Sequence, residues 1–309
     1  MKKKIAILLN HKTVSSWQMT REQAEYLAQK MPDYEVELCL NKETFLTALP
    51  EAEIVLTWEF RQEWVPRAKK LKILATPAAG KDYFQVEFPP NVRRIHGQFH
   101  GAFMAETALG MLLGMRRGLL PMASNWQQEV WPRTQMAAVM RPLSSSTTMV
   151  LGFGKIGQSV GKILKPLQNR ILGVRYHENR EKRSWMSKED RVLCGNEWLD
   201  YLPEVDQLVA VLPRSSSTDH IIDEKVLSAL PKHAVFCNLG RGNAVDEEAL
   251  CAALRRGDIA GACLDVFQEE PLPAESPIRN CPNLWWQPHS SAIVPNYLNC
   301  FVDDFIRQL

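Results

Sequence analysis

Arg241, Glu270 and His289 are three polar side chains whose types suit acid–base chemistry on a carbonyl compound. They occur in the segments NLGRGNAVDEEAL (238–250), LDVFQEEPLP (264–273) and WWQPHSSA (285–292). A guanidinium can hold a carboxylate and polarise a carbonyl, and an imidazole beside a carboxylate can transfer a proton. Each residue taken alone is more often a solvated loop side chain, so the three are informative only as a set.

Strand-like runs precede these segments, and this fixes where the side chains should lie. AVFCN comes before Arg241 and GACL comes before Glu270. In an open α/β fold, ligands bind outside the carboxyl ends of the parallel strands. The sequence therefore predicts that Arg241, Glu270 and His289 share one cleft at the carboxyl edge of a sheet.

The hexapeptide GFGKIG (152–157) carries the G-x-G-x-x-G pattern, which alone is a weak signal. The β-branched run TTMVL precedes it and the amphipathic segment KIGQSVGKIL follows it, so the glycines stand at a strand-to-helix turn. There Gly152 permits a tight turn, Gly154 lets the backbone approach a pyrophosphate, and Gly157 lets the helix pack closely. The helix N-terminus offers N–H groups to phosphates, so this context predicts dinucleotide binding.

The end of the next strand, ILGVRY followed by His177, bears on the choice of dinucleotide. NAD-specific sites usually place Asp or Glu there, where it bonds the ribose 2′-hydroxyl. Here the surrounding cations are Arg175, Arg180, Lys182 and Arg183. Cations neutralise a 2′-phosphate, so NADP(H) is favoured over NAD(H). The adjacent Glu178 can serve a hydroxyl instead, and charges that merely solvate an exposed loop are a third interpretation.

The elements that must position these residues occur in two series. The first hundred residues alternate apolar runs such as KIAILL and EIVLTW with helix-like segments such as REQAEYLAQKM, ETFLTAL and RQEWVPRAKKL. A second series with the same rhythm begins at residue 147. This rhythm is typical of two doubly wound α/β units, each built on a largely parallel sheet.

The segment between the two series predicts a long helix around residues 101–120. One apolar stripe comprises Ala105, Ala108, Leu109, Leu112 and Leu113, and another comprises Met104, Met111 and Met115. A helix that is apolar on two faces needs two partners, so we expect one face to pack on a second subunit of a homodimer. Burial of both faces within one chain is the alternative.

Composition restricts the partners and the location. Lys and Arg number 37 against 35 Asp and Glu in 309 residues, a net charge of +2, so no global field attracts nucleic acid or an anionic membrane. The apolar run in MKKKIAILLNHK is too short for a signal peptide and predicts a first strand. No apolar run approaches the ~20 residues that span a bilayer. We expect a soluble, cytoplasmic protein.

The cysteines and histidines give no metal site. The seven cysteines include no C-x-x-C pair, and Cys194, Cys237 and Cys263 lie in or beside strand-like runs. Buried thiols in a reducing compartment are therefore expected, with a catalytic or metal-binding thiol as the less favoured alternative. His96 and His100 have i, i+4 spacing, but flanking glycines argue against a helix, so no metal is predicted.

Five motifs occur in the order found in a known family. GFGKIG, LPRSSST, NLGRGNAVDEEAL, LDVFQEEPLP and PHSSA closely resemble successive signatures of the D-isomer-specific 2-hydroxyacid dehydrogenase family, over nearly the whole chain. The resemblance implies a Rossmann-type dinucleotide domain (98–288) inserted into a flavodoxin-like substrate domain (1–97 and 289–309). It also implies hydride transfer between NAD(P)H and a small 2-keto or D-2-hydroxy acid. Within the family the chain looks most like the glyoxylate and hydroxypyruvate reductases.

The resemblance also assigns roles. It implies that Arg241, Glu270 and His289 are the catalytic trio, and that Arg241 shares the substrate carboxylate with backbone N–H groups near Ala79 and Gly80 in ATPAAGKDY (75–83). Asp265 is expected at the nicotinamide end. The full set of expected cofactor contacts is Gly152, Gly154, Lys155, Ile156, Gly157, His177, Arg180, Pro213, Ser215, Leu239, Gly240, Asp265 and Ser291.

Departures from the family pattern leave the substrate open. His177 replaces the usual acidic residue, His100 stands where many members have Asn, and PAAG is less glycine-rich than the usual substrate loop. Trp58, Phe60 and Arg61 in TWEFR can face the substrate side chain or be ordinary loop residues.

The alternative function comes from another class of protein. Transcriptional corepressors also resemble this family, so an NAD(H)-sensing regulatory scaffold without turnover is the second hypothesis. The complete trio and the lack of a polar tail before Leu309 favour the enzyme.

Overall fold

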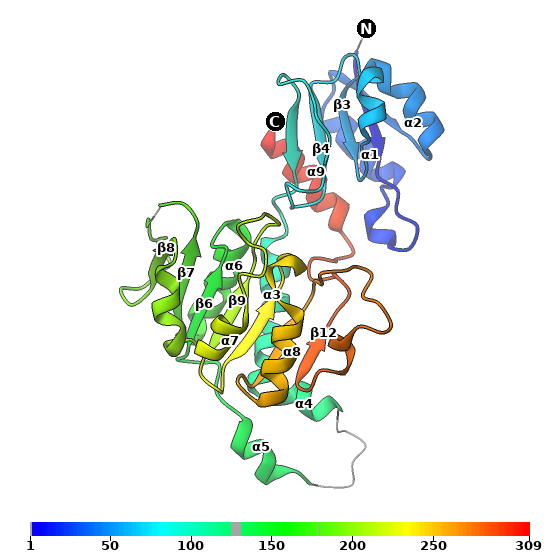
Figure 1. Ribbon diagram of the computed structural model, residues 1–309. Helices are drawn as coiled ribbons and strands as arrows, with labels where there is room; N and C mark the ends of the chain where they lie inside the picture. Colours follow the sequence, from blue (N-terminus) through cyan, green and yellow to red (C-terminus); the bar gives the residue numbers. More distant parts are fainter. Residues whose placement is uncertain (1, 125–130, 179) are drawn as a thin grey trace. The chain divides into compact units, whose positions relative to one another are not determined.

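The computed structural model describes residues 2–124, 131–178 and 180–309 (Figure 1). It divides into two compact units, Met1–His100 with Ile293–Leu309, and Gly101–Ala292. Each unit contains one parallel sheet with helices, so the predicted α/β class is confirmed. The unit boundaries lie a few residues after those expected, which places His289 in the second unit.

The first unit is built on a five-stranded sheet in the order β2-β1-β3-β4-β5. Every pair is parallel, and the order is that of flavodoxin-like folds. The strands are β1 Lys3–Leu8, β2 Tyr34–Leu38, β3 Ala52–Thr57, β4 Ile73–Thr76 and β5 Arg93–His96, and the helices are α1 Arg21–Lys30, α2 Lys42–Ala48 and α9 Tyr297–Gln308. Short 3-10 helices span Ser15–Trp17, Leu49–Glu51 and Gln62–Arg67.

The helix α9, from the end of the chain, packs within this first unit. Its Asn299 side chain accepts a hydrogen bond from Gln23 of α1 at 2.7 Å, and its Asp303 accepts one from Tyr26 at 2.8 Å. The buried Asp304 accepts the backbone N–H of Gln98 at 2.7 Å. Side-chain and backbone donors from two earlier segments thus hold the last helix on the first unit.

The second unit is built on a seven-stranded sheet in the order β12-β11-β10-β9-β6-β7-β8. All its pairs are parallel, and the first six strands of the unit follow the Rossmann order, with β12 added at one edge. The strands are β6 Thr147–Leu151, β7 Arg170–Arg175, β8 Arg191–Cys194, β9 Gln207–Ala210, β10 Val235–Asn238, β11 Gly261–Leu264 and β12 Leu284–Trp286. The order reverses at β6, so the topological switch point lies between β6 and β9.

Helices cover both faces of this sheet (Figure 1). They are α3 Gly101–Arg116, α4 Leu119–Ser124, α5 Arg133–Val139, α6 Lys155–Leu164, α7 Glu224–Ala229 and α8 Glu247–Arg256, with 3-10 helices at Lys165–Leu167, Glu197–Glu204, Gly242–Ala244 and Pro277–Asn280. Met149 and Leu151 of β6 join the buried cluster of α7 and α8, whereas Val150 joins that of α3 and α6. Alternate residues of one strand therefore build two cores, as expected of a buried parallel strand.

The long helix expected around residues 101–120 is shorter than predicted. It ends at Arg116, because Gly118 adopts a φ of +69°, a left-handed conformation that does not continue a right-handed helix. Met104 and Met115, from the second apolar stripe, are buried in the same core as Ala105 and Leu112. Burial of both stripes within one chain therefore accounts for much of this helix without a second subunit.

The segment RQEWVPRAKKL was expected to be helical and is only partly so. It forms a 3-10 helix over Gln62–Arg67, where Pro66 lacks the N–H that an α-helix requires. The strand β5 was not predicted, and it lies at an edge of its sheet.

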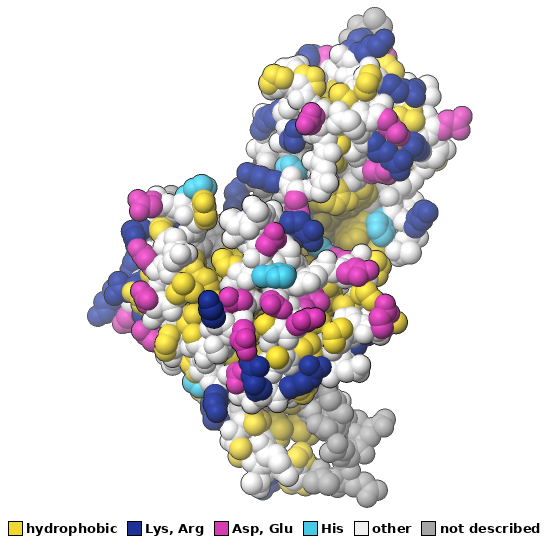
Figure 2. All heavy atoms as spheres, viewed as in Figure 1, with side chains coloured by type: hydrophobic (Ala, Val, Ile, Leu, Met, Phe, Trp, Pro, Cys, Tyr) yellow, Lys and Arg dark blue, Asp and Glu magenta, His cyan; other side chains and the backbone are white. Residues whose placement is uncertain are grey.

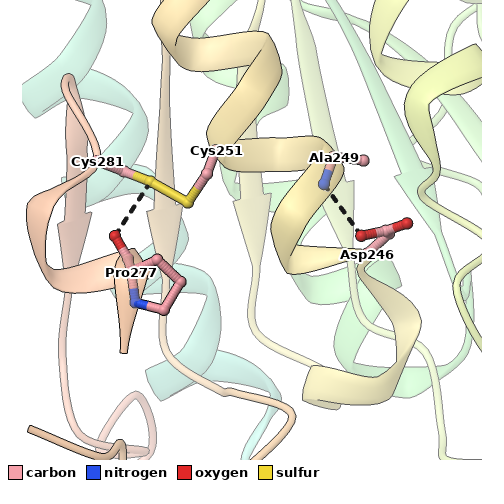
Figure 3. Close-up of a disulfide and its surroundings, with 5 residues drawn as sticks. All are labelled: Asp246, Ala249, Cys251, Pro277 and Cys281. Atoms are coloured by element: carbon pink, nitrogen blue, oxygen red, sulfur yellow. Dashed lines mark hydrogen bonds between the residues drawn. A yellow bond between two sulfur atoms is a disulfide. The ribbon is translucent and has the colours of Figure 1, made fainter. Parts of the chain in front are cut away.

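The expectation that the cysteines are all thiols is wrong for one pair. Cys251 of α8 forms a disulfide with Cys281, which precedes β12, with their Cα atoms 5.6 Å apart (Figure 3). The two residues are 30 apart in sequence, a spacing that carries no signal, and they meet because the helix Pro277–Asn280 packs beside α8. Free cysteines in the described part of the chain are Cys39, Cys194, Cys237, Cys263 and Cys300.

Charge and hydropathy agree with the composition. Figure 2 shows basic and acidic side chains intermixed over the face in view, without a broad patch of one sign. Among the described residues, no helix is both long and apolar enough to cross a membrane. The same residues contain no group of three or more His, Cys, Asp or Glu arranged to hold a metal ion.

Candidate active site

The predicted site residues of the second unit all follow strands of one parallel sheet. The glycine turn follows β6, Pro213 and Ser215 follow β9, and Arg241 follows β10. Glu270 follows β11 and His289 follows β12. Because parallel strands end at the same edge, the structure places these loops together at the carboxyl edge of the sheet.

Glu270 and His289 form the best-defined pair at this edge. Glu270 Oε2 lies 2.7 Å from His289 Nδ1, and Glu270 Oε1 accepts the backbone N–H of Phe267 at 3.0 Å. The side chains of His289 and Glu270 are 51% and 34% exposed. The hydrogen bond to Glu270 raises the pKa of His289 above its ordinary value, although partial desolvation opposes it. Burial alone would raise the pKa of Glu270, but the bonds from His289 and Phe267 outweigh it and the net pKa is lowered. The pair therefore favours an imidazolium beside a carboxylate.

Asp265 holds the loop that carries His289. Its side chain is fully buried, and its carboxylate accepts the backbone N–H groups of Ser290 at 2.7 Å and Ser291 at 3.2 Å. The Asp265 carbonyl accepts the N–H of His289 itself at 2.8 Å. His289 adopts a φ of +49°, an uncommon conformation for a residue with a side chain. These bonds hold His289 in that conformation, a role of Asp265 that the sequence did not predict.

Arg241 enters the site from the loop after β10. Asn238 shapes this loop, since its side chain donates to the Arg241 carbonyl and accepts the Gly240 N–H, both at 3.0 Å. The charge of Arg241 helps to lower the pKa of both Glu270 and His289, which shows that the guanidinium acts on both partners. The three expected side chains thus form one electrostatically connected group.

The glycine turn has the shape needed to hold a pyrophosphate. A Cβ at Gly152, whose φ is +88°, would lie 2.4 Å from the Val211 carbonyl oxygen, and one at Gly157 would lie 2.3 Å from the Gly152 carbonyl oxygen. A Cβ at Gly154 would meet nothing within 4 Å, so space lies open over the start of α6. Gly154 is the N-cap of α6, and Lys155 and Ile156 are its first residues. Tight packing at two glycines and open space at the third fit a bound dinucleotide.

The loops after β9 and β10 lie against each other beside this turn. The Thr218 hydroxyl donates to the Pro213 carbonyl at 2.8 Å and accepts the Ser215 N–H at 3.1 Å, which closes a compact turn. A Cβ at Gly240 would lie 2.5 Å from the backbone nitrogen of Leu212. The backbone at Gly240, next to Leu239, therefore approaches the loop that carries Pro213 and Ser215.

The region after β7, expected to bind the adenosine end, lies at the protein surface. His177 and Tyr176 are exposed, and the His177 carbonyl accepts the Cys194 thiol at 3.5 Å. Arg180 forms two hydrogen bonds with Glu197, of 2.8 and 2.5 Å. The cation predicted to meet a 2′-phosphate is thus paired with a carboxylate at the start of the 3-10 helix Glu197–Glu204.

In the first unit, Ala79 and Gly80 follow β4 in a loop that is fixed at its start by Ala78. Thr76 Oγ1 accepts the Ala78 N–H at 3.3 Å, and the Ala78 carbonyl accepts the N–H of Gly97 at 3.0 Å. Both predicted residues are half-buried. The loop and the residues that hold it all belong to the first unit.

The aromatic residues after β3 divide between core and surface. Phe60 is buried against Trp64, which favours the second of its two interpretations, that of a structural residue. Trp58 instead lies among three rings that the sequence did not single out, those of Trp17, Tyr83 and Tyr297. The Tyr297 hydroxyl lies 2.8 Å from His100 Nε2, so the buried His100 contacts this aromatic group.

The sheet order and the glycine turn define the second unit as a dinucleotide-binding domain. Residues 109–291 match the profile of the D-isomer specific 2-hydroxyacid dehydrogenase, NAD binding domain. The chain belongs to the D-isomer specific 2-hydroxyacid dehydrogenase family.

Named relatives and a solved structure agree with this membership. The chain is 30% identical over 286 residues to glyoxylate/hydroxypyruvate reductase B of Yersinia enterocolitica, covering 87% of this chain and 84% of the relative. It is 28% identical to D-3-phosphoglycerate dehydrogenase of Methanocaldococcus jannaschii, covering 88% of this chain but only 52% of that relative. A family member from Aeromonas salmonicida superposes with a TM-score of 0.78 at 26% identity, covering 100% of this chain and 96% of that one.

Proposed function

We propose that the protein reduces a small 2-keto acid to a D-2-hydroxy acid with a nicotinamide cofactor. The observation that carries this proposal is the Glu270–His289 hydrogen bond of 2.7 Å, beside the charge of Arg241 at the carboxyl edge of a Rossmann-order sheet. When bound, the reduced nicotinamide supplies the hydride to the keto carbon. The residues of the chain supply the proton and the positioning.

His289 is the proton donor in this mechanism. Its Nδ1 faces Glu270, so Nε2 is the nitrogen left to protonate the developing alkoxide. Because Glu270 raises the pKa of His289, the imidazole stays protonated to higher pH than an isolated one. In the oxidising direction the neutral imidazole takes the proton from the hydroxyl.

Arg241 and the loop at Ala79 and Gly80 position the acid. The guanidinium has donors enough to hold a carboxylate oxygen and the keto oxygen together, which orients the carbonyl and stabilises the charge that develops on it. Backbone N–H groups near Ala79 and Gly80 bind the rest of the carboxylate. The substrates that we propose are glyoxylate and hydroxypyruvate, as in the name of the Yersinia relative.

The cofactor that we propose is NADP(H) rather than NAD(H). His177 stands where an acidic residue would bond the ribose 2′-hydroxyl, and basic residues surround it. Glu197 works against this preference because it already pairs with Arg180. The proposal therefore assigns the 2′-phosphate mainly to His177, with Arg180 shared between the phosphate and Glu197.

A homodimer and a cytoplasmic location complete the proposal. Leu119, Trp131 and Val139, near or within α4 and α5, are 64%, 81% and 61% exposed, which is apolar surface suited to a second copy. Sedimentation of the purified protein tests the dimer, and a monomer at micromolar concentration would refute it. Fractionation of cells that produce the protein tests the location, and recovery outside the cytoplasmic fraction would refute it.

The decisive experiment follows the absorbance of NADPH and NADH with a panel of small 2-keto acids. We expect turnover with glyoxylate and hydroxypyruvate, and its loss in the His289→Asn variant. Cofactor binding without turnover of any acid in the panel would refute the enzyme and favour a dinucleotide-sensing scaffold.

A further inference from the structure

Two adjacent glutamates in the first turn of α8 have different surroundings. Asp246 caps the helix, and its Oδ1 accepts the N–H of Ala249 at 3.0 Å (Figure 3). Glu247 and Glu248 are both placed to interact favourably with the positive end of the helix dipole. Glu248 is exposed, whereas Glu247 is half-buried and its Oε1 accepts the backbone N–H of Gln268 at 2.8 Å. A role in starting the helix accounts for Glu248 but not for this contact.

The loop that contains Gln268 is tied to the segment before α8 at several points. The Gln268 amide Nε2 donates to the Val245 carbonyl at 2.7 Å and lies 3.2 Å from His220 Nε2. A Cβ at Gly242 would lie 1.8 Å from the carbonyl carbon of Phe267, so that backbone lies directly against the Phe267–Gln268 peptide. The Phe267–Gln268 peptide is therefore held by packing against the backbone of Gly242 and by the hydrogen bond to Glu247.

The same peptide is connected to Glu270. The N–H of Phe267 donates to Glu270 Oε1 at 3.0 Å, and Glu270 Oε2 lies 2.7 Å from His289 Nδ1. Two successive N–H groups, of Phe267 and Gln268, thus donate to two different carboxylates, Glu270 and Glu247. A displacement of the backbone at Gln268 would therefore also displace the neighbouring Phe267 N–H, which bonds Glu270.

We propose that Glu247 is a positioning residue, whose carboxylate oxygen anchors the Gln268 N–H and so holds Glu270 in reach of His289. An acceptor oxygen meets this requirement, and the negative charge is not needed. Proton transfer depends on such placement, since a displacement of about 1 Å can cost roughly a hundredfold in rate. The catalytic consequence rests on the proposed function, whereas the geometry of the pair exists without substrate or cofactor.

Three variants distinguish the effects of the acceptor oxygen of Glu247, of its negative charge, and of a carboxylate in the first turn of α8. Glu247→Gln keeps the oxygen and loses the charge, Glu247→Ala loses both, and Glu248→Ala removes a carboxylate from the same turn without touching the loop. Glu247 itself titrates, with a pKa raised by burial and lowered in part by Gln268 and His220, so the Gln variant is needed to separate its charge from its contact. The charged groups that act on His289 are Glu270, Asp265 and Arg241, and all three stay in each variant.

The first readout is an NMR titration of His289 in cofactor-free protein, with its signal assigned from the His289→Asn variant. We expect His289 to titrate at lower pH in Glu247→Ala than in the wild type, and at the wild-type pH in Glu247→Gln and Glu248→Ala. The second readout is kinetic. In Glu247→Ala we expect kcat to fall by roughly ten- to a hundredfold, with the alkaline limb of reduction moved to lower pH and the KM for NADPH unchanged.

Thermal unfolding distinguishes positioning from loss of stability. A destabilised Glu247→Ala protein whose His289 titrates as in the wild type would overturn the proposal, and so would an equal shift in Glu248→Ala. A Glu247→Gln variant that behaves like the Ala variant would show that charge, not the acceptor oxygen, matters, and would also overturn it. If the wild type turned over no 2-keto acid, the proposed function would fail while the NMR titration still decided this inference.

Discussion

The two ends of the carboxyl edge of the seven-stranded sheet are held in different ways. At the β11–β12 end, Asp265 is fully buried and its carboxylate accepts two backbone N–H groups, while Glu270 bonds both a backbone N–H and His289. At the β7–β8 end, His177 is exposed and Arg180 meets Glu197 in a surface ion pair. The geometry of the proposed proton donor is therefore set by hydrogen bonds within the chain, whereas the proposed recognition of the adenosine end depends on exposed charges that already pair with each other.

This difference predicts large effects of substitution at the first end and small effects at the second. A side chain that bonds several partners leaves them unsatisfied when it is changed, even where it is solvent-accessible as Glu270 and His289 are, whereas an isolated exposed ion pair contributes only about 0–1 kcal/mol. The predictions below follow that order.

Arg241→Lys should have the largest effect. A lysine cannot reproduce two parallel N–H donors, so we expect kcat to fall and the KM for the 2-keto acid to rise, lowering kcat/KM by roughly a hundredfold or more. Steady-state kinetics over the substrate panel measure both constants. Arg255→Lys, on the exposed last turn of α8, is the matched control. Unchanged constants in Arg241→Lys would remove this residue from the site.

Glu270→Gln should change the pH dependence more than the fold. Glu270 raises the pKa of His289, so loss of its charge lowers that pKa and leaves less imidazolium at neutral pH. Reduction needs the protonated form, and its alkaline limb should therefore move to lower pH, while oxidation of the hydroxy acid suffers less. The neighbouring Glu269→Gln is the control. A wild-type reduction profile in the Glu270→Gln variant would show that Glu270 does not tune His289.

The fold was predictable in its interior and less so at its edges. Buried parallel strands such as TTMVL and AVFCN are predominantly apolar or β-branched runs, and both were recognised. The missed strand β5 lies at a sheet edge, is four residues long, and begins with the exposed Arg93 and Arg94. An edge strand hydrogen-bonds to one neighbouring strand and is open to solvent along its other edge, so its sequence need not be apolar throughout.

The site was predictable where single motifs carry it. Arg241, Glu270 and His289 stand in recognisable segments, and the structure places all three at one sheet edge. Three contacts join residues that are distant in sequence: the hydrogen bonds to Asp265, the hydrogen bond from the Gln268 N–H to Glu247, and the Cys251–Cys281 disulfide. Such pairs form only when the chain is folded, so the local sequence pattern around either residue does not predict the partner.

His177→Asp tests the weakly held end. A carboxylate bonds a ribose hydroxyl but repels a phosphate, so we expect the ratio of kcat/KM for NADH to that for NADPH to rise by roughly tenfold or more. The kcat with saturating cofactor should change little, because His177 is far along the edge from His289. A wild type that already prefers NADH strongly would contradict the NADP(H) proposal.

Glu197→Gln should have the smallest effect, and it tests whether the ion pair with Arg180 influences cofactor binding. The substitution keeps the shape of the side chain but frees Arg180 from a competing carboxylate, so a 2′-phosphate gains a cation. An exposed pair is weak, and we expect the KM for NADPH to fall by only about two- to fivefold at low salt, with no change for NADH. Glu204→Gln is the matched control, because Glu204 forms an equally short exposed pair with Arg170 at the start of β7, the opposite edge of the sheet. Equal effects of the two variants, or an equal gain for NADH, would mean that Arg180 does not meet the 2′-phosphate, and the choice of cofactor would then depend on His177 alone.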